Sequence, residues 1–354
     1  MKMNTILNKA RTRMNNNISL MIGVIIPLLV SYFVPFIAIK WWIKTAKRLN
    51  IVGRDMNKPY ENEVPEAGGV WVTIGIAFGL LFYVALRRYI TGREANLVEI
   101  MAIISLELLA AFLGLLDDVL GWKKGLKPWQ KIAFTFPIAL PLIVVRAGYT
   151  TIELPVIGVI DLGPAYSILL VPIGVVGAAN GFNMLAGYNG LEAGMGTLLL
   201  LGVLVKALQH NRLWIAYMAL IGIVALIAFL YYNWFPAKVF PGDSLTHPFG
   251  AFYASLIILG NMEKFGMFLF IPYFLDALLY FKAKIIDKVT FRVEAFAKVH
   301  SDGSLSPPYD RIYDTTHLAI KVLSKIKGKV YERDVVLFIL GLESIILVLG
   351  LIFL

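Results

Sequence analysis

Residues 168–194 read ILLVPIGVVGAANGFNMLAGYNGLEAG, an apolar run that passes directly into a segment rich in asparagine and glycine. The run at 168–179 is apolar enough to lie in lipid, whereas residues 180–194 contain three asparagines and four glycines. Amide side chains at the tip of a membrane helix are costly unless they hold something polar. The stretch therefore predicts a membrane helix that ends at a binding site, with a simple helix cap and turn as the alternative.

The spacing of the polar residues indicates how such a site is built. Asn180 and Asn183 lie three residues apart, so one helix face would present both amides to a single ligand. Farther along, glycines flank Tyr188 and Asn189. Glycine permits a tight turn and a close approach of the backbone to a bound molecule.

The composition of the 354-residue chain assigns it to the membrane. The chain is 58% hydrophobic and 16% charged, against about a quarter charged in soluble domains, and its mean hydropathy is +0.74. Because a helix needs about 20 apolar residues to cross a bilayer, we predict an all-α polytopic integral membrane protein with about ten transmembrane helices. The apolar segments lie at 18–40, 68–86, 97–116, 131–147, 164–181, 195–209, 212–231, 245–262, 264–281 and 334–354.

We predict a single membrane-embedded domain over residues 1–354, with a basic segment at 1–17 and a long loop at 283–332 between the last two spans. The N-terminal segment is too basic, and its apolar run too long, for a cleaved signal, so the first span is predicted as an anchor. The absence of cysteine excludes disulfides and thiolate metal sites. The net charge of +10 favours anionic lipid or an anionic substrate. Nucleic acid is not expected, because the basic residues sit in loops between spans rather than on one folded face.

Lysine and arginine concentrate in the loops that follow odd-numbered spans, and the loop at 283–332 is the richest. The positive-inside rule places these loops in the cytoplasm and both termini outside. Four N-terminal residues oppose this orientation, although the bias of the loops is larger: Lys2, Lys9, Arg11 and Arg13. We therefore predict a multi-pass protein whose active site faces the cytoplasm, in the cell membrane if the source is prokaryotic or archaeal.

The polar clusters fall on this same side of the predicted membrane. Asp117 and Asp118 close the third apolar segment, and Lys127 follows nine residues after Asp118. The asparagine segment ends the fifth span, and Asp243 follows the seventh. Scattered structural polarity would not sort in this way, so we predict one site near the membrane surface.

Adjacent acids at the end of an apolar helix are unfavourable without a cation. Burial and the partial negative charge of a helix C-terminus both disfavour ionised Asp117 and Asp118. A divalent metal or a cationic partner such as Lys127 would resolve this. The alternative is a solvated pair at the membrane surface.

Asp243 follows a Pro-Gly turn and precedes an apolar helix, so it either caps that helix or binds a metal. Mg²⁺ prefers oxygen ligands and is held by one or two protein groups together with substrate phosphates. Asp243 and the amide oxygen of Asn183 fit that pattern, with Mn²⁺ as an alternative ion. Lys127 and Arg311 would then neutralise phosphate oxygens.

Four motifs occur in an order that resembles a known enzyme superfamily. They are PEAGG at 65–69, LDD at 116–118, NMLAGYNGLEAG at 183–194, and NWFP with VFPGD between 233 and 243. Together they resemble the polyprenyl-phosphate N-acetylhexosamine-1-phosphate transferases. The similarity is closest to the UDP-GlcNAc:dolichyl-phosphate GlcNAc-1-phosphate transferase branch, and it covers residues 20–285.

The resemblance implies a reaction. A sugar-1-phosphate, by default GlcNAc-1-phosphate, passes from a UDP-sugar to a polyprenyl or dolichyl phosphate in the presence of Mg²⁺, and UMP is released. In that branch this transfer is the first membrane step of lipid-linked glycan assembly for protein N-glycosylation. The expected partners are thus a UDP-sugar, a polyprenyl or dolichyl phosphate and the membrane, with a homodimer as an open alternative.

The resemblance also implies roles for individual residues. It assigns Asn183 and Asp243 to the metal and Lys127 to the pyrophosphate. It places Asp117 at the lipid phosphate, as a base or an orienting group, with Asp118 behind it.

Three more residues are implied on the donor side: Gly187, Tyr188 and Asn189 would lie along the uridine pocket. We also predict that Glu66, Asn180 and Asp310 take part in binding the nucleotide and sugar.

The sequence PPYDR at 307–311 departs from the family pattern. Arg311 matches the family arginine, but Asp310 stands where a histidine is expected, and His317 is out of register. The identity of the sugar therefore stays open, with UDP-GlcNAc as the default and another UDP-sugar as the alternative.

Other functions are weighed against the transferase. The same chemistry with undecaprenyl phosphate or another UDP-sugar would serve cell-surface polysaccharide. A secondary transporter of an anionic solute predicts inverted repeats and charges near the middle of spans, and the sequence shows neither. A membrane scaffold without catalysis would have no need of acids, amides and lysine on one side.

Overall fold

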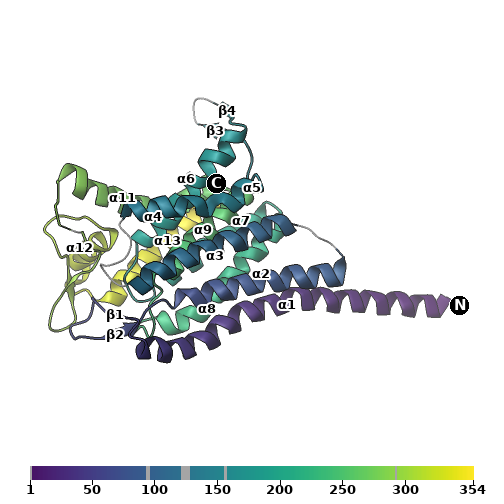
Figure 1. Cartoon of the computed structure of the whole chain (residues 1–354), viewed down its shortest axis with the longest axis horizontal. Coiled ribbons are helices and arrows are strands. Elements are labelled where there is room, and N and C mark those ends of the chain that lie inside the picture. The colour runs from purple at the N-terminus through teal and green to yellow at the C-terminus, as the bar shows by residue number, and fades with distance from the viewer. Residues whose placement is uncertain (1, 93–95, 121–127, 155–157, 292) are drawn as a thin grey trace.

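The computed structural model describes residues 2–92, 96–120, 128–154, 158–291 and 293–354. Helices dominate these residues and lie as one bundle (Figure 1). The helices are α1 (Lys2–Arg48), α2 (Gly69–Thr91), α3 (Leu97–Leu120), α4 (Pro128–Thr135), α5 (Leu140–Val144), α6 (Val171–Met184), α7 (Leu191–Gln209), α8 (Leu213–Asn233), α9 (Asp243–Leu259), α10 (Glu263–Leu269), α11 (Ile271–Phe281), α12 (Thr315–Lys327) and α13 (Glu332–Phe353).

Short strands in the loops between helices form three antiparallel pairs. They are β1 (Val52–Arg54) with β2 (Glu63–Pro65), β3 (Thr151–Leu154) with β4 (Gly158–Asp161), and β5 (Lys298–Val299) with β6 (Leu305–Ser306). In Figure 1, β1, β2 and α12 lie at the end of the bundle where α1 finishes, and the N-terminus lies at the opposite end.

The chain is a multi-pass integral membrane protein. Within the described ranges, seven helices are long and apolar enough to cross a membrane, and the bent pair α10–α11 brings the number to eight if it is one span. The sequence predicted about ten spans, and that number is not confirmed. The two remaining predicted segments form shorter helices, at 129–144 and in the 17-residue α9.

Proline explains why the predicted fourth span is not a continuous helix. Pro137 and Pro141 interrupt the segment, which folds as α4, a 3₁₀ turn at Phe136–Ala139 and the short α5. Proline lacks the N–H that a helix interior needs and clashes with the preceding turn. The break leaves α4 as a separate short helix that can carry a polar side chain to the end of the bundle.

Helix α9 is the central helix of the fold. Every residue from Ser244 to Ile258 is buried, and a helix that is apolar on all sides belongs in a core. Glycines allow its neighbours to come close. A Cβ added at Gly114 of α3 would lie 2.7 Å from the Ser244 nitrogen, and one at Gly250 of α9 would lie 2.6 Å from the Ala179 Cα of α6. These contacts fix the start of α9 against α3 and α6.

We expect Gly114→Ala to lower the unfolding midpoint of the protein in detergent. The added methyl group would overlap the backbone at Asp243, and overpacking of this kind costs about 1–3 kcal/mol. Differential scanning fluorimetry measures the midpoint. Gly341→Ala is the matched control, because a Cβ there meets nothing within 4 Å. Equal midpoints for the two variants would contradict the close packing of α3 on α9.

Candidate active site

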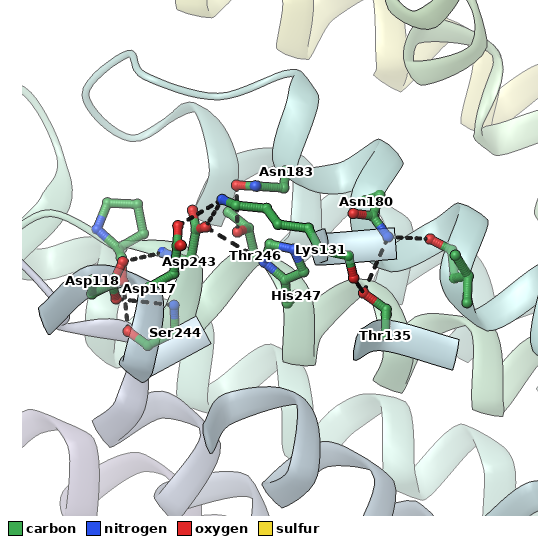
Figure 2. Close-up of polar contacts among 12 residues, drawn as sticks. Asp117, Asp118, Lys131, Thr135, Asn180, Asn183, Asp243, Ser244, Thr246 and His247 are labelled. Atoms are coloured by element: carbon green, nitrogen blue, oxygen red, sulfur yellow. Dashed lines mark hydrogen bonds and ion pairs between the residues drawn. The ribbon is translucent and has the colours of Figure 1, made fainter. Parts of the chain in front are cut away.

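Three helices bring a lysine and two aspartates together at one end of the bundle. The Lys131 Nζ of α4 lies 2.7 Å from the Asp117 Oδ2 of α3 and forms a second ion pair with Asp243 at the start of α9 (Figure 2). The three side chains are 15 to 20% exposed, so the cluster is half-buried yet open to a ligand. Two carboxylate oxygens therefore face one positive charge.

Asp118 caps the helix that carries Asp243. Its carboxylate accepts hydrogen bonds from the backbone N–H groups of Asp243 at 2.7 Å and Ser244 at 3.1 Å. The first N–H groups of a helix have no partner within the helix, and a carboxylate satisfies both their hydrogen bonding and the helix dipole. A Cβ at Gly242, which has a φ of +68°, would overlap the Asp118 carboxylate. Asp118 therefore positions Asp243.

The two amides at the end of α6 have different partners. The Oδ1 of Asn183 accepts a hydrogen bond at 2.8 Å from the hydroxyl of Thr246, which lies one turn after Asp243 in α9. The Nδ2 of Asn180 donates to the Val176 carbonyl at 2.9 Å and to the Thr135 hydroxyl at 3.4 Å. Asn183 thus lies beside the carboxylate cluster, whereas Asn180 joins α6 to α4.

Two residues of the site were not chosen from the sequence. Lys131 lies at the boundary of a predicted span, and the sequence favoured Lys127, which lies outside the described residues. His247 is buried, and its Nδ1 lies 3.9 Å from the Asp243 Oδ2. The signal for His247 was available, because residues four apart lie on the same helix face.

The residues present suit a hard divalent cation. The described part of the chain contains no group of three or more His, Cys, Asp or Glu able to hold a metal. Mg²⁺ needs only one or two protein oxygens when substrate phosphates supply the rest. Asp117 and Asp243 already converge on a single cation, the Lys131 amine. The Asn183 oxygen contacts Thr246, one turn after Asp243 at the start of α9. This donor set fits magnesium.

Comparison with known proteins identifies the family to which the residues of this cluster belong. Residues 100–261, from α3 to the turn after α9, match glycosyl transferase family 4. A Saccharolobus solfataricus protein with the provisional name UDP-N-acetylglucosamine–dolichyl-phosphate N-acetylglucosaminephosphotransferase is 33% identical over 333 residues, which are 94% of this chain and 97% of the relative. The chain belongs to glycosyl transferase family 4.

Similarity extends to other members and related enzymes. The UDP-N-acetylglucosamine–dolichyl-phosphate N-acetylglucosaminephosphotransferase of Dictyostelium discoideum is 27% identical over 268 residues, covering 65% of this chain and 64% of the relative. The phospho-N-acetylmuramoyl-pentapeptide-transferase of Dictyoglomus thermophilum is 28% identical over 243 residues, covering 68% and 75%. The family match contains the whole cluster of Asp117, Lys131 and Asp243.

Glu66 of this family member lies in the turn before α2. Burial, and then the negative charge of Asp243, raise the pKa of its carboxyl from 4.5 to about 7. A Cβ at Gly53 would overlap the Glu66 side chain, so β1 packs directly on it. Glu66 is thus close enough to Asp243 for the negative charge of Asp243 to contribute to the raised pKa of its carboxyl.

We expect Glu66→Gln to raise the unfolding midpoint at pH 8 but not at pH 5. Folding raises the pKa of Glu66, so the folded state holds a proton that the unfolded state releases between pH 4.5 and about 7. The stability present below pH 4.5 is lost as the pH rises through 7, by about 1–3 kcal/mol. Thermal unfolding of both proteins at the two pH values measures this. If the midpoint of Glu66→Gln differs from that of the wild type by the same amount at pH 5 and at pH 8, the prediction is contradicted.

The predicted uridine residues lie in the turn between α6 and α7. Tyr188 and Asn189 are buried, and the Tyr188 hydroxyl lies 3.3 Å from the Ala295 carbonyl, to which it donates. Gly187 has a φ of +100°, and its N–H donates at 2.7 Å to the Glu192 Oε1. In this structure the two side chains contact protein groups, so their proximity to a nucleotide stays a prediction.

The last loop keeps its two predicted residues at the surface. Arg311 pairs with Asp287, and Asp310 is exposed. His317 of α12 is fully buried, and desolvation lowers the pKa of its imidazole to about 4. The structure therefore brings together four of the predicted residues and leaves the last loop outside their contacts; the four are Asp117, Asp118, Asn183 and Asp243.

Proposed function

We propose that this chain transfers N-acetylglucosamine-1-phosphate from UDP-GlcNAc to a polyprenyl phosphate of the dolichyl type and releases UMP. One observation carries the proposal: the carboxylates of Asp117 and Asp243 converge on Lys131 beside Asn183. A relative named for this reaction is similar over 94% of the chain. The transfer is the first membrane step of lipid-linked glycan assembly for protein N-glycosylation.

The reaction needs charge neutralisation and alignment more than covalent help from the protein. An oxygen of the lipid phosphate forms a bond to the β-phosphorus, the bond from that phosphorus to the bridging oxygen breaks, and UMP leaves with the electron pair. Lys131 supplies a positive charge for the pyrophosphate oxygens. Asp117 orients the incoming phosphate, which is already largely ionised at neutral pH, so a strong base is unnecessary.

Magnesium is proposed as the cofactor, held by Asp243 and Asn183 with Asp117 nearby. When bound, it would neutralise the pyrophosphate and polarise its phosphorus–oxygen bonds. Asp118 holds Asp243 in place by accepting hydrogen bonds from the first backbone N–H groups of α9, and these bonds need no ligand. The oxygen donors and their convergence on one cation support this assignment.

We infer that α4–α5 and α9 complete ten spans and that the site faces the cytoplasm, in the cell membrane. Helix α9 is enclosed by other helices, so it needs no full lipid-facing length. The loops after spans 1, 3 and 9 carry most of the lysine and arginine, which the positive-inside rule assigns to the cytoplasm. Accessibility labelling of a cysteine placed at Lys321 in sealed vesicles tests the orientation.

A second candidate is the same transfer with undecaprenyl phosphate or another UDP-sugar. Asp310 stands where the dolichyl branch has a histidine, and a phospho-N-acetylmuramoyl-pentapeptide-transferase is 28% identical over 68% of this chain. A panel of UDP-sugars and lipid phosphates of different length and saturation decides between the candidates. The preferred pair is the one with the highest kcat/KM.

The experiment that tests the proposal uses purified protein in detergent. With UDP-GlcNAc, dolichyl phosphate and Mg²⁺ it should form UMP, and omission of the lipid or addition of EDTA should stop the reaction. Equal UMP formation without lipid would show hydrolysis of the donor and contradict the proposal.

A further inference from the structure

A second polar cluster lies in the first loop, apart from the carboxylates that face Lys131. Asp55, Asn57 and Lys58 connect β1 to β2, and all three are buried although their side chains are charged or amide. The Lys58 Nζ lies 3.0 Å from the Asp55 Oδ2, pairs with Glu332 at the start of α13, and sits 4.5 Å from the centre of the Phe235 ring. Lys58 is therefore enclosed by its own loop and by two distant parts of the chain.

The cluster surrounds Asn189. The Nδ2 of Asn189 donates to Asp55 at 3.3 Å, and its backbone N–H donates to the Glu332 Oε1 at 2.8 Å. Its Oδ1 accepts from the Ala237 N–H at 2.7 Å and from the Lys58 Nζ at 3.5 Å. The amide of Asn189 thus has protein partners on both its oxygen and its nitrogen.

The same loop also holds Gly187. The Nδ2 of Asn57 donates to the Gly187 carbonyl at 3.1 Å, and its Oδ1 accepts from the Ala297 N–H at 3.2 Å. Only residues 185–190 separate α6 from α7. The turn is therefore fixed at both Gly187 and Asn189 by the first loop, and it follows directly on the end of α6 that carries Asn183.

The charges make this cluster sensitive to the loss of Lys58. A buried ion pair contributes little net stability, but removing one partner leaves the other charge buried without compensation. Without Lys58, the carboxylates of Asp55 and Glu332 would face each other around Asn189. They would repel or take up water, and either change displaces the turn to which both are bonded.

We propose that Lys58 and Glu332 are positioning residues that fix the turn at 185–190, and with it Asn183, for the nucleotide-sugar donor. This inference rests on the proposed function. The two residues act through Asn189 and need no contact with substrate. Their loss should therefore weaken use of the donor more than use of the lipid acceptor.

The test measures steady-state kinetics of Lys58→Met, Glu332→Gln and the double variant with UDP-GlcNAc and dolichyl phosphate. Each single variant should raise the KM for UDP-GlcNAc by about tenfold or more, while kcat and the KM for the lipid change by less than about threefold. The double variant should lose no more than the worse single variant, because the two residues act as one unit. Glu332→Gln keeps the size of the side chain and the acceptor for the Asn189 N–H, so it tests the inference if Lys58→Met does not fold.

Lys329→Met is the matched control. Lys329 forms a lysine–aspartate pair with Asp302 at 2.6 Å, but the two side chains are 70% and 40% exposed. This variant should leave both KM values unchanged. An unchanged donor KM in folded Glu332→Gln, equal rises in both KM values, or simple additivity in the double variant would overturn the inference.

Binding of UDP separates this inference from the proposed function. Isothermal titration of UDP with Mg²⁺ into wild-type protein and Glu332→Gln should show an affinity loss of about tenfold. If wild-type protein binds UDP but transfers nothing to lipid, the proposed function fails, while the affinity loss still supports the positioning role. Equal affinities overturn the positioning role even if wild-type transfer is confirmed.

Discussion

Asp243→Asn should lower kcat for UMP formation by about 100- to 1000-fold or more, the range seen when one electrostatic contact to a developing charge is lost. The substitution keeps the shape of the side chain and removes its negative charge. In this structure the Asp243 carboxylate pairs with Lys131. The backbone N–H of Asp243 donates a hydrogen bond to the Asp118 Oδ1 at 2.7 Å, and this bond does not depend on the side chain. The geometry of α9 should therefore survive while the cation site is lost.

Radiometric or coupled-enzyme measurement of UMP gives the rate, and the unfolding midpoint shows that the variant is folded. Asp161→Asn is the control, because Asp161 is an exposed aspartate whose carboxylate accepts hydrogen bonds from the Gly163 N–H and the Thr150 side chain, both outside the Asp117–Lys131–Asp243 cluster. The control should keep wild-type activity. A folded Asp243→Asn protein with more than a third of wild-type kcat would contradict the metal assignment.

Lys131→Met should reduce kcat/KM for UDP-GlcNAc by about 100-fold or more, since charge-assisted contacts to phosphate are strong in half-buried sites. Lys131 is the only described cation shown to pair with both Asp117 and Asp243. Its removal would leave the two carboxylates facing an anionic donor. Lys321→Met, in the exposed part of α12, is the control and should have no effect.

Measuring Lys127→Met beside Lys131→Met shows which of the two lysines contributes to use of UDP-GlcNAc. The sequence resemblance assigns the pyrophosphate contact to Lys127, whereas the structure shows Lys131 between the aspartates. Both substitutions should therefore be measured with the same donor concentrations. Full activity in Lys131→Met would contradict the role derived from the structure, whatever the effect at Lys127.

Part of the site could be predicted from the sequence because polar residues at the ends of apolar segments are unusual. That reasoning found Asp117, Asn183 and Asp243, which the structure places together. It could not find the capping of α9 by Asp118, because Asp118 lies 125 positions before Asp243, the first residue of α9. The pairing depends on how α3 packs against α9, and no local pattern reports it.

The fold was predicted in class but not in detail. Apolar segments indicate helices that cross a membrane, and seven helices of the described residues are long and apolar enough to do so. The interruption at Pro137 and Pro141 was readable from the residues, yet length alone suggested a full span. Lys131 was passed over for the same reason, since it stands where that span was expected to begin.

The last loop shows where sequence reasoning ends. Arg311 was chosen by alignment to a family pattern, but its ion pair with Asp287 depends on the path of a loop that has little regular structure. Asn189 was chosen for a nucleotide, and its neighbours Lys58 and Glu332 are 131 and 143 positions away. Such tertiary contacts determine whether a polar residue faces a ligand or the protein.

We propose that this chain transfers a sugar phosphate to a lipid phosphate at the Asp117–Lys131–Asp243 cluster. Incubation with UDP-GlcNAc labelled with ³²P at the β-phosphorus tests it most directly. We expect the label to appear in an organic-extractable lipid pyrophosphate, unlabelled UMP to form in equal amount, and Asp243→Asn to form both products at least about 100-fold more slowly. Label that stays in water-soluble sugar phosphate, with UMP formed at the same rate without lipid, would contradict it.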